Sequence, residues 1–203
     1  MNYNHLVIVL GPSGSGKDTL ISGTKSILAN DPDFHFITRE ITRPSVENDE
    51  RHIETSEESF HHRRDAGAYA IYWHAHDTWY GITQKIEDYL AEGKVVVFNG
   101  SRAALDEAKK RFPDVKIIFI STPKDILTER LIARGRESDI QVKERIDRNT
   151  RLNTIPEDAI VLSNEGTLQQ TLNEFLEILQ KILADESKPV IDYTDRNHMK
   201  QSI

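Results

Sequence analysis

The chain has 203 residues, of which 37% are hydrophobic, so it can fill one well-packed domain but not two independent ones. Its formal net charge of -7 argues against a broadly basic surface of the kind that binds nucleic acid or anionic membranes, and any anion site must therefore come from a local concentration of arginines. The absence of cysteine excludes disulfides, thiolate metal sites and cysteine nucleophiles.

The start of the chain, MNYNHLVIVLG, has no basic leader, and its apolar run is only about five residues long. No later stretch approaches the roughly 20 apolar residues that a membrane span needs. We therefore expect a cytoplasmic protein with no nucleic-acid partner and no membrane partner.

Short apolar runs alternate along the chain with longer amphipathic segments. The runs are rich in β-branched residues, as in strands buried on both faces of a sheet, and cover residues 6–10, 95–98, 115–120 and 159–162. Helical patterns follow them at residues 16–29, 102–111, 124–134 and 167–184. This alternation predicts an α/β fold with a parallel sheet flanked by helices.

Two stretches interrupt the alternation. Residues 36–82 are rich in Arg, His, Trp and Tyr and predict a small inserted subdomain of short strands with one helix near 56–66. Residues 134–148 are strongly charged and predict a mobile flap. After the single domain predicted for residues 1–185, the segment 186–203 has few core-forming residues and predicts a flexible tail.

The segment LGPSGSGKDTL, residues 10–20, joins the first predicted strand to the first predicted helix, which is the context of a phosphate-binding loop with the pattern G-x-x-x-x-G-K. Its glycines let the backbone curl so that N–H groups point inward, and the helix N-terminus adds positive charge. Lys17 is expected to reach the β- and γ-phosphates. The predicted nucleotide-binding residues are Gly11, Pro12, Ser13, Gly14, Ser15, Gly16, Lys17, Asp18 and Thr19.

Asp18 stands where this pattern usually has Ser or Thr. A carboxylate can replace that hydroxyl as a Mg²⁺ ligand, but without the metal it would repel the phosphates. The alternative is that Asp18 is a first-turn residue favoured by the helix dipole, with Thr19 or Ser15 supplying the hydroxyl. The residues alone leave both interpretations open.

Several segments, in order and at comparable spacing over residues 5–183, resemble the guanylate kinase group of phosphate-loop kinases: GPSGSGK, then TRP, SEESF, WYGIT, AEGKVVVFNG, KKRFPD and RGR. The resemblance implies ATP as co-substrate, Mg²⁺, an acceptor-binding insert and an arginine-bearing lid. The last two match the interruptions at 36–82 and 134–148. The resemblance also places Arg43 and Tyr80 on the phosphate of the acceptor.

The positions that recognise guanine in that group differ here. The resemblance places its glutamate at Ile71 and its other acids at Asn99 and Ser101, so the bonds that would hold guanine are lost. This substitution suits an acceptor with a second phosphate in place of a base. The acceptor region instead contains these cationic or hydrogen-bonding side chains: Arg39, Arg51, His52, His74, His76 and Arg102.

Together with YWHAH and NGSR, these segments resemble the ribose 1,5-bisphosphate phosphokinases of phosphonate breakdown. That resemblance implies ATP-dependent phosphorylation of a small sugar phosphate, ribose 1,5-bisphosphate, on its 1-phosphate. Two alternatives stay open, a nucleoside monophosphate kinase and a non-catalytic binding module on the same fold. The implied acceptor residues are Arg39, Arg43, His52, Tyr80 and Arg102, and the implied catalytic cations are Lys17 and the lid arginines Arg134, Arg136 and Arg145.

Overall fold

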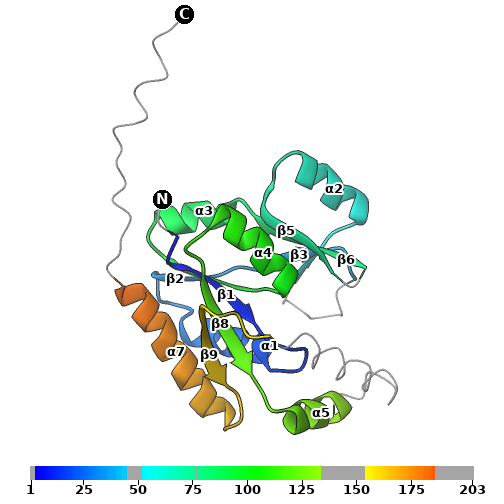
Figure 1. The fold of residues 1–203 in the computed structure, drawn as a ribbon. Helices are drawn as coiled ribbons and strands as arrows, with labels where there is room; N and C mark the ends of the chain where they lie inside the picture. The colour runs from blue at the N-terminus through cyan, green and yellow to red at the C-terminus, as the bar shows by residue number, and fades with distance from the viewer. Residues whose placement is uncertain (1–2, 45–51, 76, 134–153, 186–203) are drawn as a thin grey trace, which may run out of the picture.

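The structure is a computed structural model that describes residues 3–44, 52–75, 77–133 and 154–185 (Figure 1). The predicted flap at 134–148 and its arginines Arg134, Arg136 and Arg145 lie outside the described residues, and so does the predicted tail from residue 186 onward. None of the described helices combines the length and the apolar character that a membrane crossing requires.

A five-stranded parallel sheet forms the centre of the molecule, with the strand order β2-β7-β1-β8-β9. The strands are β1 (Leu6–Leu10), β2 (Phe34–Phe36), β7 (Val95–Asn99), β8 (Lys116–Ser121) and β9 (Ala159–Ser163). All except β2 were predicted to within a residue at either end, because each is a nearly continuous apolar run. The fold class predicted from sequence is thereby confirmed.

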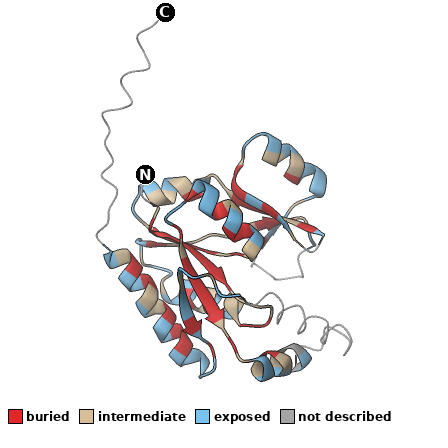
Figure 2. Ribbon diagram, in the orientation of Figure 1, coloured by how far each residue is buried: buried red, intermediate tan, exposed pale blue. Residues whose placement is uncertain are grey.

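Helices cover both faces of this sheet, because side chains that alternate along each strand point to opposite sides. Val7 and Val9 face a cluster that includes Phe175, and Ile8 faces a cluster that includes Phe112. Figure 2 shows the buried strands between these two layers. The first layer holds α1 (Lys17–Ile27) and α7 (Leu168–Ala184), the second holds α3 (Lys85–Ala91) and α4 (Arg102–Arg111), and α5 (Lys124–Ala133) follows β8.

A second, four-stranded sheet lies beside the α4 layer in the order β4-β3-β6-β5. Its strands β3 and β4 are parallel, and its other pairs are antiparallel. Because α4 packs against β5, both sheets share one hydrophobic cluster. The strands are β3 (Arg39–Ile41), β4 (His52–Glu54), β5 (Tyr69–Ala75) and β6 (Thr78–Thr83), and α2 (Glu57–Asp65) lies in the connection between β4 and β5.

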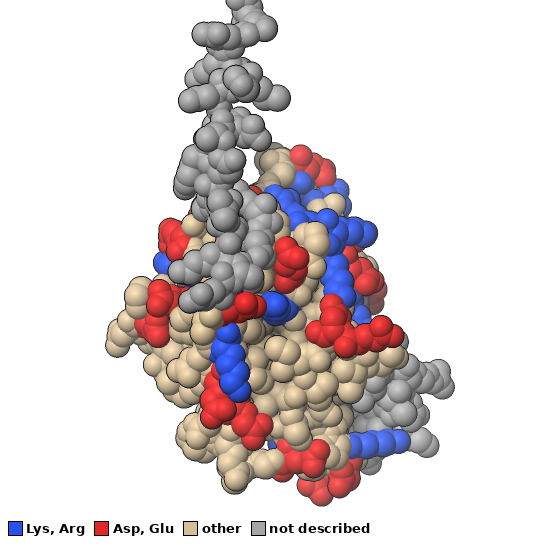
Figure 3. All heavy atoms as spheres, turned by 60° about the vertical axis from the view of Figure 1, so that its left-hand side comes forward, with Lys and Arg blue, Asp and Glu red and all other residues tan. Residues whose placement is uncertain are grey.

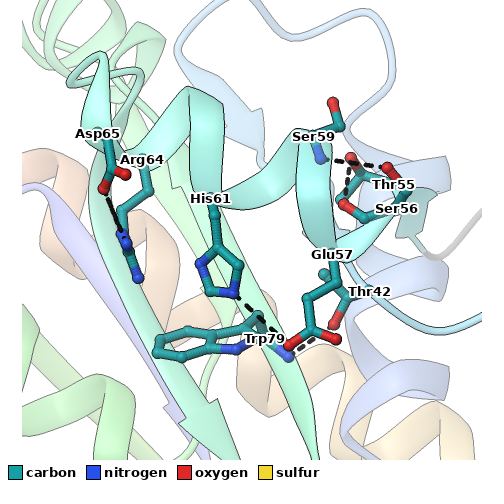
Figure 4. A network of polar contacts seen from close by, with 9 residues as sticks. All are labelled: Thr42, Thr55, Ser56, Glu57, Ser59, His61, Arg64, Asp65 and Trp79. Atoms are coloured by element: carbon teal, nitrogen blue, oxygen red, sulfur yellow. Dashed lines mark hydrogen bonds and ion pairs between the residues drawn. The ribbon is translucent and has the colours of Figure 1, made fainter.

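Local polar contacts hold α2 and its cap, and the rings of His61 and Trp79 join the helix to the second sheet (Figure 4). The helix begins at Ser56, whose hydroxyl accepts a hydrogen bond from the backbone N–H of Ser59 at 3.1 Å. His61 Nε2 lies 3.5 Å from a Glu57 carboxylate oxygen, and the His61 ring stands edge-on to Trp79 at 5.2 Å. His61 and Trp79 therefore pack between α2 and the second sheet.

A buried carboxylate, Glu40 of β3, joins the second sheet to α2. It accepts hydrogen bonds from Arg63 of α2 at 2.5 Å and from the hydroxyl of Tyr69 at 2.6 Å. Burial and the neighbouring Glu40 carboxylate raise the pKa of Tyr69, so its hydroxyl stays a donor. The Tyr69 ring lies against Gly81, where a Cβ atom would be 2.6 Å from it. The glycine of the WYGIT segment is therefore a packing requirement.

Charges of both signs lie side by side on the face of the molecule drawn in Figure 3. Ion pairs among the described residues include Arg111 with Glu87 at 2.7 Å and Lys94 with Glu92 at 2.7 Å. On this face the charge is mixed in sign, in keeping with a formal net charge of only -7.

Candidate active site

The predicted phosphate loop lies between the central strand β1 and the start of α1. Gly11, Gly14 and Gly16 take φ angles of 148°, 89° and 90°, which L side chains rarely adopt. A Cβ atom at Gly11 would also lie 2.6 Å from the carbonyl oxygen of Ile120, and one at Gly16 would lie 2.5 Å from the Asn164 side-chain nitrogen. The loop therefore needs glycine at both ends, for conformation and for space.

Side chains from distant parts of the chain hold this loop. The Asn164 amide, directly after β9, donates to the backbone carbonyl of Ser15 at 2.7 Å, and its oxygen accepts from the Thr171 hydroxyl at 3.2 Å. Thr122, directly after β8, donates to the same Ser15 carbonyl at 3.3 Å. Ser15 itself is fully buried, which favours a packing role for it over the supply of a metal-binding hydroxyl.

Lys17 bends back over the loop that precedes it. Its Nζ donates to the backbone carbonyls of Gly11 at 2.7 Å and Pro12 at 2.9 Å. These contacts keep the ammonium group within the curl of the loop instead of in bulk water. The structure thus places a cation and the N-terminus of α1 at one point, as binding of a polyphosphate requires.

Arg130 of α5 is a second cation at this loop, and sequence analysis missed it. Its Nη2 donates to the backbone carbonyl of Asn164 at 3.3 Å, and its Nη1 would lie 3.8 Å from a Cβ atom on Gly16. Among the described residues, this buried Nη1 has no hydrogen-bond partner. The helical pattern at 124–134 predicted only a helix, because nothing in that pattern says which side chain faces the loop.

A cavity of about 340 Å³ opens on the other side of Asp18, a volume suited to a small molecule. It lies between α1, the segment that joins β2 to β3, and the carboxyl end of β7. The polar residues that line it are Asp18, Ser22, Lys25, Ser26, Thr38, Arg39 and Asn99.

Three of these side chains meet at one wall of the cavity. An Asp18 carboxylate oxygen accepts a hydrogen bond from the Asn99 amide at 2.5 Å and lies 4.0 Å from Nη2 of Arg39. The Arg39 guanidinium also lies 5.8 Å from the centre of the Tyr80 ring, which stacks on Trp73 at 5.1 Å. The structure therefore brings together Asp18, Arg39 and Tyr80, which were predicted separately.

The other predicted acceptor residues do not line this cavity. Arg43 is exposed just beyond β3, and His52 is buried on β4, in register with Arg39. Arg102 begins α4 and donates to the backbone carbonyl of Thr154 at 2.8 Å, while burial lowers the pKa of its guanidinium. Their roles in acceptor binding stay predictions.

Comparison with known proteins agrees with this arrangement. The family model described as guanylate kinase matches residues 3–186 of the sequence. The chain belongs to the guanylate kinase family. Along this chain, β3 to β6 with α2 form a second sheet unit between β2 and β7 of the central sheet.

The similar curated proteins are named ribose 1,5-bisphosphate phosphokinase PhnN. The protein from Thiobacillus denitrificans is 38% identical over 93% of this chain and 98% of its own length. The proteins from Klebsiella pneumoniae and Agrobacterium fabrum are 36% and 35% identical, over 92% and 91% of this chain and 98% and 100% of their own lengths. A guanylate kinase structure from Anaplasma phagocytophilum shares the fold, with a TM-score of 0.67 at 15% identity, over 90% of this chain and 88% of that one.

The positions that sequence analysis compared with the guanine-binding acids have other partners in this member of the guanylate kinase family. Ile71 is 1% exposed and belongs to the hydrophobic core. The Ser101 hydroxyl accepts from the backbone N–H of Ala104 at 3.3 Å and so caps α4. The Asn99 amide is bonded to Asp18. None of these three positions presents a carboxylate to a base.

Members of this family are kinases and use a nucleotide, usually with Mg²⁺, so we asked whether the described residues form a metal site. They contain no group of three or more His, Cys, Asp or Glu side chains that could hold an ion. Asp18, the predicted ligand, faces the Arg39 guanidinium, which opposes a second cation at the same oxygen. Mg²⁺ bound with a nucleotide takes one or two protein ligands and completes its shell with phosphates and water, so a cluster of three side chains is not required, and ligation by Asp18 stays a prediction.

Proposed function

We propose that this chain is an ATP-dependent ribose 1,5-bisphosphate phosphokinase. It transfers the γ-phosphoryl group of ATP to the 1-phosphate of its acceptor and gives 5-phospho-α-D-ribose 1-diphosphate and ADP. The observation that carries the proposal is the near full-length similarity, at 35% to 38% identity, to three proteins of that name.

The acceptor side of the site supports the same substrate. A nucleobase needs hydrogen-bond partners at its edge, and a pocket without them loses its discrimination. Here Ile71, Asn99 and Ser101 are committed to the core, to Asp18 and to a helix cap. The cavity instead offers the cations Arg39 and Lys25. Cations of this kind bind phosphate groups through charge-assisted hydrogen bonds.

The reaction needs no general base. An anionic oxygen of the 1-phosphate attacks the γ-phosphorus, the bond from that phosphorus to the β-phosphate oxygen breaks, and ADP leaves. The second pKa of a phosphate ester is near ~6, so this nucleophile is already ionised at neutral pH. The protein's task is therefore to align the two reactants and to neutralise their charge.

Three groups of the described structure contribute to that task. The loop amides and the N-terminus of α1 hold the donor phosphates, and Lys17 lies in the curl of the loop. Arg130 adds a half-buried cation beside Gly16. By resemblance we also propose Arg134, Arg136 and Arg145 as cations on the transferring group, MgATP as the donor and the cytoplasm as the location.

Acceptor profiling with γ-labelled ATP tests the proposal. Ribose 1,5-bisphosphate should be phosphorylated far faster than guanosine or adenosine monophosphate, and ribose 5-phosphate should be poor because it lacks the attacking 1-phosphate. Equal turnover of guanosine monophosphate would make the protein a nucleotide kinase. No transfer to any acceptor by the folded protein would make it a binding module.

A further inference from the structure

The carboxylate of Asp18 belongs by position to the phosphate loop but faces the acceptor cavity. It lines that cavity together with Arg39 and Asn99. Its oxygen accepts from the Asn99 amide at 2.5 Å and lies 4.0 Å from the Arg39 guanidinium. Asp18 is on α1, Asn99 on β7 and Arg39 on β3, so three separate elements converge on one carboxylate.

A negative side chain in this place weakens the binding of an acceptor with two phosphates, because like charges repel across a small cavity. Arg39 offsets part of that charge. A carboxylate has two oxygens and only accepts hydrogen bonds, so it binds groups that donate. The phosphates of ribose 1,5-bisphosphate are acceptors at neutral pH, and its donors are the hydroxyls on C2 and C3.

We infer that Asp18 and Asn99 bind the ribose hydroxyls of the acceptor and so make the site selective for a sugar with both hydroxyls. This inference rests on the proposed function and adds the part of the acceptor that is not phosphate. The Asp18 carboxylate accepts from a hydroxyl, and the Asn99 amide both holds that carboxylate and offers its own oxygen. Arg39, whose guanidinium lies 5.8 Å from the centre of the Tyr80 ring, is the group in this cavity that pairs with a phosphate of the acceptor.

Acceptor analogues test this inference directly. For the unaltered protein, kcat/KM for 2-deoxyribose 1,5-bisphosphate or its 3-deoxy counterpart should be about 10- to 100-fold below that for ribose 1,5-bisphosphate, which is the usual effect of losing a hydrogen bond to a charged group. In Asp18→Ala the ratio of kcat/KM for the ribose acceptor to kcat/KM for the deoxy acceptor should fall to within about threefold of one. Asn99→Ala should also lower this ratio.

Asp125→Asn is the matched control. Asp125 is an exposed carboxylate in the first turn of α5, as Asp18 is an acid in the first turn of α1, so the control removes a comparable helix-dipole interaction away from the cavity. It should keep the discrimination between ribose and deoxyribose acceptors. Asp18→Asn, which keeps the shape of the side chain, provides a second variant if Asp18→Ala does not fold.

A binding measurement separates this role from metal ligation. Ribose 1,5-bisphosphate and its 2-deoxy analogue are each titrated into the unaltered protein and into Asp18→Asn by calorimetry, with EDTA and without nucleotide. The unaltered protein should bind the ribose compound more tightly, and Asp18→Asn should bind the two compounds equally. The Mg²⁺ concentration for half-maximal activity should stay within about twofold. If Asp18→Asn instead raises the Mg²⁺ requirement and keeps the sugar discrimination, the inference is overturned and Asp18 is a metal ligand.

The same experiments distinguish failure of the proposed function from failure of the inference about Asp18 and Asn99. If the unaltered protein does not phosphorylate ribose 1,5-bisphosphate at all, the proposed function fails and this inference fails with it. If the unaltered protein phosphorylates it but treats the deoxy analogues equally well, only the inference about Asp18 and Asn99 fails.

Discussion

The phosphate loop and the acceptor cavity touch at Asp18, but they are built in different ways. The loop is a stretch of backbone whose shape depends on glycines at fixed spacing, with φ angles of 148° at Gly11 and 90° at Gly16. The acceptor cavity is lined by side chains from α1, the segment before β3, and β7. A backbone site tolerates little sequence change, whereas a site of side chains can change its substrate by substitution at a few positions.

This difference explains how one fold serves different acceptors. Donor recognition uses groups that every chain has, namely amide N–H groups and a helix N-terminus, together with one lysine. In the proposed function, acceptor recognition uses the identities of single residues that line the cavity, such as Arg39 and Asn99. Mutations in the loop should therefore stop the chemistry, and mutations in the cavity should change which acceptor is used.

The largest effect is expected at the loop. Lys17→Ala should lower kcat at least about 100-fold while circular dichroism stays unchanged, because a charge contact to the transition state in a shielded site contributes several kcal/mol. The control Lys181→Ala removes an exposed lysine on α7 and should keep full activity. Near-normal turnover of a folded Lys17→Ala protein would show that the loop is not the donor site.

A smaller effect, confined to one substrate, is expected at Arg102. Arg102→Ala should weaken binding of ribose 1,5-bisphosphate by about 1.5 to 3 kcal/mol, the usual contribution of a charge-assisted hydrogen bond, and leave the KM for ATP unchanged. Arg111→Ala, at the other end of α4, is the matched control. An unchanged acceptor KM would restrict Arg102 to its contact with the Thr154 carbonyl.

A weaker effect still is expected at the Tyr69–Glu40 contact, which supports β3 beside Arg39. Tyr69→Phe removes the hydroxyl that donates to buried Glu40 at 2.6 Å, and should lower the free energy of unfolding in urea by about 1.5 kcal/mol. Because Arg39 and Glu40 are adjacent on β3, acceptor KM should rise while ATP KM does not. Exposed Tyr72 supplies the control, Tyr72→Phe. Equal stability of both variants would mean that Glu40 does not need this donor.

The smallest effect is expected at the end of the chain. Truncation after Glu186 should leave turnover and melting temperature nearly unchanged, because both hydrophobic clusters and the described site residues come from residues up to Asp185. A thermal melt and a standard assay of the truncated protein are enough to check this. A large loss of either would show that residues 187–203 contribute to the fold or to the site.

Much of the core could be predicted from sequence because local patterns carry it. Strands β1, β7, β8 and β9 are apolar runs, and α7 repeats its apolar residues with helical periodicity. β2 was missed because its three residues are too few to show a period, and α3 because seven residues with three charges resemble a loop. The length and apolar content of each strand or helix therefore decided whether it could be predicted from sequence.

The site divides in the same way. The loop was predicted because its spacing is local, but Asn164 and Arg130 could not be assigned to it without knowing that β8 lies next to β1 and β9 next to β8. The direction of the Asp18 carboxylate was also hidden, since it depends on Asn99 and Arg39, which only the folded topology brings near. Contacts between distant segments are set by strand order, and strand order is not a property of any one segment.

The contact between Asn164 and the carbonyl of Ser15 spans 149 residues of sequence and has a consequence for biosynthesis. On the ribosome, the nascent chain displays the complete phosphate loop long before β9 and the asparagine that follows it have been translated. Until then the Ser15 carbonyl lacks one of its two side-chain donors, and the central sheet lacks its last strand. We therefore expect the loop to reach its final arrangement, and with it the proposed binding of nucleotide, only after Asn164 has left the ribosome.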